Sequence, residues 1–77
     1  MWSMAASQQE QHLAQSIRHI AEFERRVTEQ EARVAEMQRD GRSTHDALKL
    51  LDLFRETLRL AIEHRESILR EMHGEFR

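Results

Sequence analysis

Arg39-Asp40-Gly41-Arg42-Ser43 is the stretch that decides the fold, because it interrupts an otherwise continuous helical pattern near the centre of the chain. Glycine readily adopts the left-handed conformation that ends helices, and Arg39 places positive charge near the negative end of the preceding helix dipole. The chain has one other glycine, Gly74, and no proline. The sequence therefore predicts two long helices of nearly equal length that fold back on each other as an antiparallel hairpin.

The composition predicts one small, soluble, all-α domain. The 77 residues are 34% charged and 39% hydrophobic, with three phenylalanines, one tryptophan and no tyrosine. Few aromatic residues and almost no helix breakers favour long helices over strands. The absence of cysteine excludes a disulfide framework and a thiolate metal site. Packing or association must therefore stabilise so small a chain.

Charge and hydropathy give no sign of nucleic acid or a membrane as a partner. A net charge of −2 provides no general attraction to nucleic acid or anionic lipid. No apolar run approaches the roughly 18 residues that a membrane span needs. The start, Met1-Trp2-Ser3-Met4-Ala5, has neither the basic nor the apolar region of a signal peptide. We therefore expect a cytoplasmic protein.

Capping signals predict where both helices begin. Ser7-Gln8-Gln9-Glu10 has the pattern of a capping box, in which the serine and glutamate side chains each bond a free backbone amide. Ser43-Thr44-His45-Asp46 is a similar signal after the break. The expected segments of this single domain (1–77) are a frayed start at 1–6, a helix at 8–39, a turn at 40–43, a helix at 44–73 and a tail at 74–77.

Both halves carry a stripe of residues spaced alternately three and four apart, as in the contact seam of a coiled coil. A short turn at Asp40-Gly41 makes residues whose numbers sum to about 81 face each other across this seam. The first stripe is Leu13, Ser16, Ile20, Phe23, Val27, Gln30, Val34 and Met37. The second stripe is Ala47, Leu51, Phe54, Leu58, Ala61, Arg65, Ile68 and Met72.

Apolar residues of the second helix spread beyond the seam, too widely for one neighbouring helix to cover. We expect a homodimer in which two hairpins form a four-helix bundle. The candidate dimer flank combines small residues of the first helix with apolar residues of the second: Ala14, Ile17, Ala21, Thr28, Leu48, Ile62 and Leu69.

A second apolar stripe lies on the opposite flank of the second helix and consists of Leu50, Leu53, Thr57 and Leu60. Such spacing suits a groove in which a helix of another protein docks. The alternative is that this stripe forms the homodimer core and the other flank is the free one. The sequence leaves the two possibilities open.

A candidate polar layer interrupts the seam where Arg65 faces Ser16, with His19 and His64 side by side on one flank. One interpretation is an anion or small-ligand sensor, with a pocket lined by the guanidinium and the two imidazoles. The interpretation that we favour is structural. Arg65 then reaches water, or pairs with a glutamate of a second subunit, and thereby disfavours slipped registers.

No motif for metal binding or catalysis is present. The chain has five histidines, but neither His-x-x-x-His nor Glu-x-x-His, the one-turn spacings of helical metal sites, occurs. A two-helix rod offers no concave pocket, and the sequence has no cysteine nucleophile and no glycine-rich phosphate loop. We therefore expect a non-enzymatic protein without metal or cofactor.

Glu63-His64-Arg65 resembles part of the phosphoacceptor box of a bacterial histidine kinase family. The Lys-Asn pair that should follow is absent, and Glu66-Ser67-Ile68 stands in its place. Those kinases also carry the histidine on the first helix, not the second. A small regulatory or phosphotransfer module that uses His64 is therefore an alternative function.

Several segments resemble short, uncharacterised proteins that are abundant in rhizobia and related alphaproteobacteria. The resemblance covers about residues 17–72, and its residues are His19-Ile20-Ala21-Glu22, Gln30-Glu31, Asp40-Gly41-Arg42-Ser43-Thr44, Ala47, Leu50-Leu51, Phe54, Leu58 and Glu63-His64-Arg65. It implies a bacterial, cytoplasmic and complete small protein, but no activity, cofactor, partner or functional residue. From the residues themselves we expect self-association and binding of a protein partner.

Overall fold

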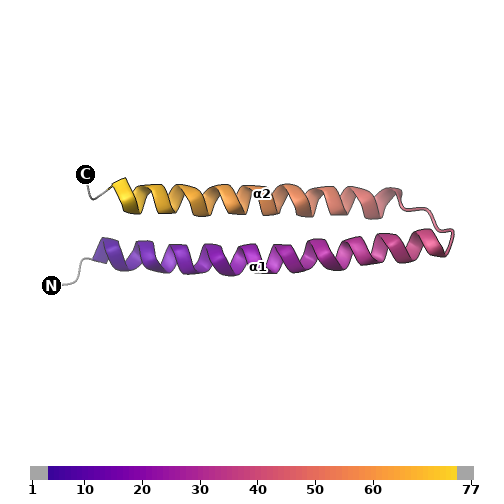
Figure 1. Cartoon of the computed structure of the whole chain (residues 1–77), viewed down its shortest axis with the longest axis horizontal. Helices are drawn as coiled ribbons and strands as arrows, with labels where there is room; N and C mark the ends of the chain where they lie inside the picture. The colour runs from indigo at the N-terminus through magenta and orange to yellow at the C-terminus, as the bar shows by residue number, and fades with distance from the viewer. Residues whose placement is uncertain (1–3, 75–77) are drawn as a thin grey trace.

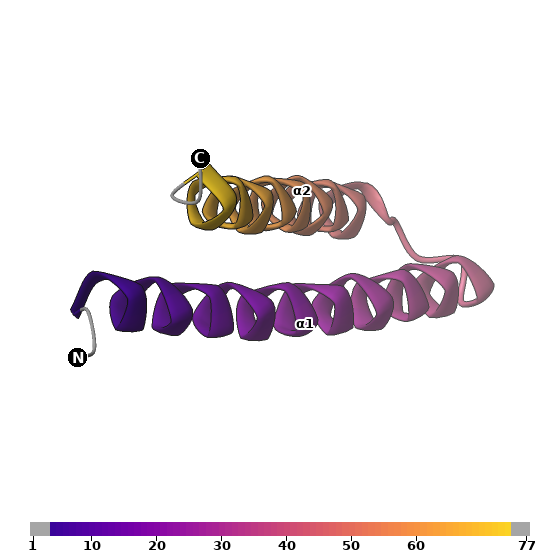
Figure 2. The same ribbon diagram turned by 60° about the vertical axis from the view of Figure 1, so that its left-hand side comes forward.

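The computed structural model describes residues 4–74, which form two long helices (Figure 1). Helix α1 spans Met4–Arg39 and helix α2 spans His45–Gly74. The two helices run antiparallel, so the start of α1 and the end of α2 lie at the same end of the hairpin. Figure 2 shows the same side-by-side arrangement after rotation. The predicted all-α hairpin is confirmed, and the described residues contain no strand.

The hairpin is a thin rod. Its principal extents are 62 × 18 × 13 Å and its radius of gyration is 17.7 Å, whereas a compact chain of this length would have a radius of gyration of about 11 Å. Only the strip between the two helices is therefore shielded from water. Most side chains lie on the surface of the rod.

The turn between the helices is a Schellman motif centred on Gly41. Gly41 has a φ of 69° and is the one residue with positive φ among those described. The N–H of Arg42 donates to the carbonyl of Met37 at 2.9 Å, and the N–H of Gly41 donates to the carbonyl of Gln38 at 3.1 Å. These two bonds satisfy carbonyls at the end of α1 that would otherwise have no partner. The predicted role of Gly41 is confirmed.

Both helices begin at residues other than those predicted. α1 begins at Met4, four residues before the expected start at Gln8, because Ala5 and Ala6 are strong helix formers and extend the helix through the capping signal. Residues 4–6 therefore belong to the helix, whereas 1–3 and 75–77 lie outside the described residues. α2 begins at His45 and ends at Gly74, in each case one residue later than predicted. The carbonyl of Thr44 accepts the first helical bond, from the N–H of Leu48 at 2.8 Å.

The two predicted stripes form the contact between the helices. All sixteen of their residues are buried or half-buried. The buried residues of 8–74 all belong to these stripes, and they are Ser16, Ile20, Gln30, Val34, Ala47, Leu51 and Ile68. The spacing of three and four residues was therefore sufficient to identify the core.

Contacts across the seam agree with the predicted register. Val34 packs with Ala47 and Leu51 in one cluster. Nearer the open end, the rings of Phe23 and Phe54 meet edge to face, with centroids 6.5 Å apart, a favourable geometry for an aromatic pair. For each of these cross-helix contacts, the two residue numbers add up to a value close to the expected 81.

Replacement of Gly41 tests the turn. Gly41→Ala is expected to lower the free energy of unfolding by about 1–2 kcal/mol, the cost of a left-handed conformation for an L-residue. An added Cβ meets no atom within 4 Å, so the loss is conformational and not steric. Gly74→Ala is the matched control, because its Cβ also enters open space but no positive φ is required. Urea denaturation at fixed protein concentration measures both variants, and equal losses would contradict the proposed role of the turn.

Replacement of Leu51 tests the seam. Leu51 is only 3% exposed, and truncation of a buried leucine to alanine typically costs about 2–5 kcal/mol. Leu48→Ala is the control, because Leu48 is 41% exposed on the same helix and should lose less than about 1 kcal/mol. Thermal denaturation followed by circular dichroism compares the two variants. A smaller loss for Leu51→Ala than for Leu48→Ala would show that the seam is placed wrongly.

Candidate protein-binding surface

Three large exposed apolar side chains of α2, together with the half-buried Thr57, form what we call the leucine stripe: Leu50, Leu53, Thr57 and Leu60. Leu50 is 41% exposed, Leu53 is 58% exposed and Leu60 is 51% exposed. The spacing of three and four residues places all four side chains on one face of the helix. The structure thus leaves the predicted partner face open to solvent along about three helical turns.

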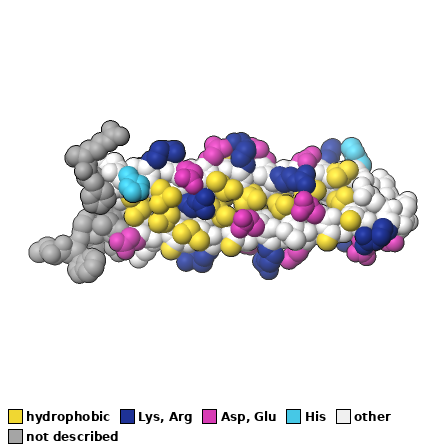
Figure 3. Space-filling model, in the orientation of Figure 1, with side chains coloured by type: hydrophobic (Ala, Val, Ile, Leu, Met, Phe, Trp, Pro, Cys, Tyr) yellow, Lys and Arg dark blue, Asp and Glu magenta, His cyan; other side chains and the backbone are white. Residues whose placement is uncertain are grey.

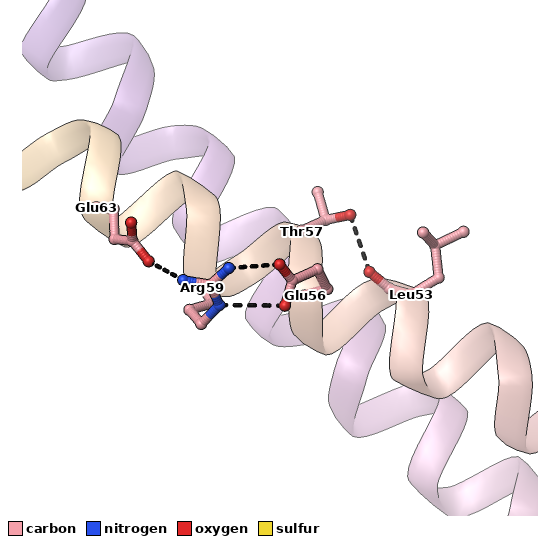
Figure 4. Close-up of polar contacts among 5 residues, drawn as sticks. All are labelled: Leu53, Glu56, Thr57, Arg59 and Glu63. Carbon is pink, nitrogen blue, oxygen red and sulfur yellow. Dashed lines mark hydrogen bonds and ion pairs between the residues drawn. The ribbon is translucent and has the colours of Figure 1, made fainter.

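Thr57 does not interrupt the apolar character of the leucine stripe. Its hydroxyl donates to the backbone carbonyl of Leu53 at 2.9 Å (Figure 4). Back-bonding of this kind satisfies a threonine hydroxyl within its own helix. The polar group is therefore already partnered, and the stripe needs no hydrogen-bonding group from whatever covers it.

A row of charges borders the leucine stripe. The Nε of Arg59 donates to Glu56 at 3.1 Å, and its Nη1 donates to Glu63. Figure 4 shows Arg59 between the two glutamates, with Thr57 and Leu53 pointing away from this group. Pairs spaced three and four residues apart commonly interact on a helix surface. The charge row was not among the predicted sites, although this spacing was readable in the sequence.

Arg59 also changes the titration of Glu56. The hydrogen bond from Arg59 is the main cause that lowers the pKa of Glu56 below 4.5; desolvation opposes this shift, and the positive charge of Arg59 adds to it. The same hydrogen bond and the charges of both glutamates raise the pKa of Arg59. Glu56 and Arg59 therefore both stay ionised at neutral pH.

The opposite flank, predicted as the dimer face, is less continuous. Ile17 is 51% exposed and Leu48 is 41% exposed. An ion pair joins Arg55 of α2 to Glu31 of α1 at 3.0 Å, and Arg55 stands one heptad from both Leu48 and Ile62, in the same row. The small residues Ala14, Ala21 and Thr28 are exposed, whereas Ile62 and Leu69 are half-buried. Charge thus divides this flank into separate apolar patches.

Figure 3 shows how apolar and charged side chains alternate on one face of the rod. Hydrophobic side chains gather in a stripe along the long axis, between two margins of charged side chains. Charged groups also lie within the stripe. The apolar stripe on this face is therefore narrow.

The candidate polar layer does not converge on a site. Ser16 is buried and its hydroxyl donates to the carbonyl of Leu13, within α1, at 2.8 Å. Arg65 is half-buried and pairs with Glu66 at 3.0 Å. Glu66 lies about 200° around the helix from His64, so the guanidinium turns away from that imidazole. His19 and His64 are both exposed.

These contacts weaken the anion-sensor alternative, because the guanidinium of Arg65 is already paired with a carboxylate of the same chain. Residues 4–74 enclose no pocket, and no three of their histidine, aspartate or glutamate side chains are grouped to hold a metal ion. Neither helix within that range is long and apolar enough to cross a bilayer. The exposed leucines of α2 are therefore the strongest candidate surface.

No protein-family model, curated protein or solved structure matches the chain. The resemblance to the rhizobial hairpin proteins accordingly remains a prediction.

The Glu56–Arg59 contact makes a prediction about pH. A carboxyl whose pKa is lowered on folding stabilises the folded state above its unfolded pKa, and this contribution disappears as the pH falls through the folded pKa. We expect NMR titration of the Glu56 carboxyl to give a midpoint below 4.5. Arg59→Gln should return the midpoint to the ordinary value, and the melting temperature should then fall less steeply at acid pH. An unchanged midpoint in Arg59→Gln would show that the contact does not form in solution.

Proposed function

We propose that this chain is a non-enzymatic hairpin that acts by self-association and by binding another protein, and that it does so in the cytoplasm. The observation that carries the proposal is the set of large apolar side chains left exposed on both flanks. They are Ile17, Leu48, Leu50, Leu53 and Leu60, each at least 41% exposed. Covering them requires a further helix, which a second hairpin or a partner protein would supply.

The shape of the hairpin supports association. Its accessible surface is 6201 Å², whereas a compact folded monomer of the same mass would expose about 4,900 Å². Burial of an exposed leucine contributes about 1.5–3 kcal/mol when complete, which is a large gain for a domain with so small a core. A homodimeric four-helix bundle is the simplest assembly that gives both helices a shared interior.

Self-association predicts a molar mass that depends on concentration. Light scattering coupled to size exclusion should give twice the monomer mass of 9.2 kDa at micromolar concentration, and dilution should lower the melting temperature. The reason is mass action, since only the folded dimer buries the exposed leucines. A constant mass of one chain, together with a melt that does not depend on concentration, would refute self-association.

The partner-binding part of the proposal has its own test. Affinity capture with the native chain, followed by mass spectrometry, identifies the proteins that bind it. Leu53→Glu/Leu60→Glu is the test variant, because it removes the most exposed leucines. Ile17→Glu/Leu48→Glu is its matched control on the other flank. Captured proteins that persist in both variants would place the binding surface elsewhere.

A further inference from the structure

We propose that this chain has a second assembly, a domain-swapped dimer in which α1, the turn and α2 become one continuous helix. In this dimer α1 of each copy packs against α2 of the other copy. The assembly goes beyond the proposed function, because it uses the buried seam and not the exposed flanks. Three observations support it: the symmetry of the seam, a heptad line that passes through the turn, and the composition of the turn.

Contacts across the seam are symmetric about the turn. The residue numbers of facing positions add up to about 81, so the midpoint of each contact lies near Asp40-Gly41. Val34 packs with Ala47 in this way, and the amide of Gln30 donates to the carbonyl of Ala47 at 2.9 Å. Two antiparallel copies related by a two-fold axis at the turn therefore form the same contacts between chains, each of them twice.

One line of the heptad repeat continues through the turn without a change of spacing. Every seventh residue from 16 to 72 is buried or half-buried in the hairpin. Thr44 is the member of this line in the connection and is half-buried, whereas residues 40–43 are exposed. The full line is Ser16, Phe23, Gln30, Met37, Thr44, Leu51, Leu58, Arg65 and Met72. A continuous helix therefore presents this line to a partner helix along its whole length.

The other seam positions require one local irregularity in the continuous helix. Successive seam positions around the turn are then 34, 37, 40, 44 and 47, which contain one extra step of three residues. Such a step overwinds a coiled coil locally and does not end it. Both halves of the swapped helix can therefore face the second copy.

The connection contains no residue that forbids a helix. Residues 40–44 are Asp-Gly-Arg-Ser-Thr, and the chain has no proline. Gly41 is the one residue with positive φ among those described, and glycine also adopts helical φ at a modest cost. Short connections of this kind are where domain swapping arises. Gly41 therefore selects the hairpin, and only its conformation and those of its neighbours must change in the swap.

Replacement of Gly41 tests the swap, with particle length as the readout. Alanine disfavours the left-handed turn and favours the helix in both chains, so Gly41→Ala should lower the dissociation constant of the swapped dimer about a thousandfold. Small-angle X-ray scattering over a concentration series should show growth from 62 Å, the length of the hairpin, to about 105 Å, the length of the continuous helix. Gly74→Ala is the matched control and should keep the short rod.

The loss of stability predicted above for Gly41→Ala applies at concentrations at which this variant is a monomer. At higher concentrations the swapped dimer relieves the unfavourable turn, and the melting temperature should rise with protein concentration.

Proline at position 43 gives a second test. The N–H groups of Gly41 and Arg42 donate the hydrogen bonds that close the turn, so the hairpin should accept Ser43→Pro. A proline inside a continuous helix removes a hydrogen bond and collides with the preceding turn. Gly41→Ala/Ser43→Pro should therefore return to the short rod, and circular dichroism confirms that each variant folds. A double variant that stays elongated would show that the long particle is not a continuous helix.

The same measurements separate this inference from the proposed function. Association of intact hairpins through their flanks doubles the mass but leaves the length close to that of one hairpin. If Gly41→Ala reaches the dimer mass without elongation, or stays a monomer at every concentration, the swap is overturned. A wild-type chain that stays monomeric while Gly41→Ala forms the long dimer would support the swap and refute self-association through the flanks.

Discussion

The left-handed turn at Gly41 is the constraint on which the rest of this structure depends. It ends α1, satisfies the last carbonyls of that helix and returns the chain antiparallel. Without it the helical pattern would continue through the centre of the chain, and the two stripes could not meet within one molecule. The turn also sets the register, because so short a connection leaves little freedom to slide one helix along the other.

Polar groups in the seam make that register specific. Gln30 is buried, and its amide donates to the carbonyl of Ala47, across the seam, at 2.9 Å. A slipped register would leave the amide buried without this partner, at a cost of about 1–3 kcal/mol. Ser16 avoids the same penalty through its bond within α1. The seam therefore combines apolar packing, which stabilises the hairpin, with buried polar groups that disfavour its alternatives.

The dimensions of the rod explain why its chemistry lies on the surface. A pair of helices shields only one strip of side chains, so neither a pocket nor an enclosed charge is available within the described residues. The remaining candidates for a binding surface are the two flanks of the hairpin. The leucine stripe is continuous and bordered by the Glu56–Arg59–Glu63 row, whereas the opposite flank is divided by an ion pair. Recognition of another helix is therefore the function that we propose for this surface.

The hairpin, its turn and its seam follow from the amino-acid sequence, because heptad spacing and the left-handed preference of glycine act over a few residues. The leucine stripe was predictable for the same reason. The partners of individual side chains were decided by the tertiary structure. Arg65 pairs with Glu66 and turns away from His64, and Gln30 finds a carbonyl of the facing helix. A long polar side chain has several rotamers, and only the neighbours that folding brings into reach select among them.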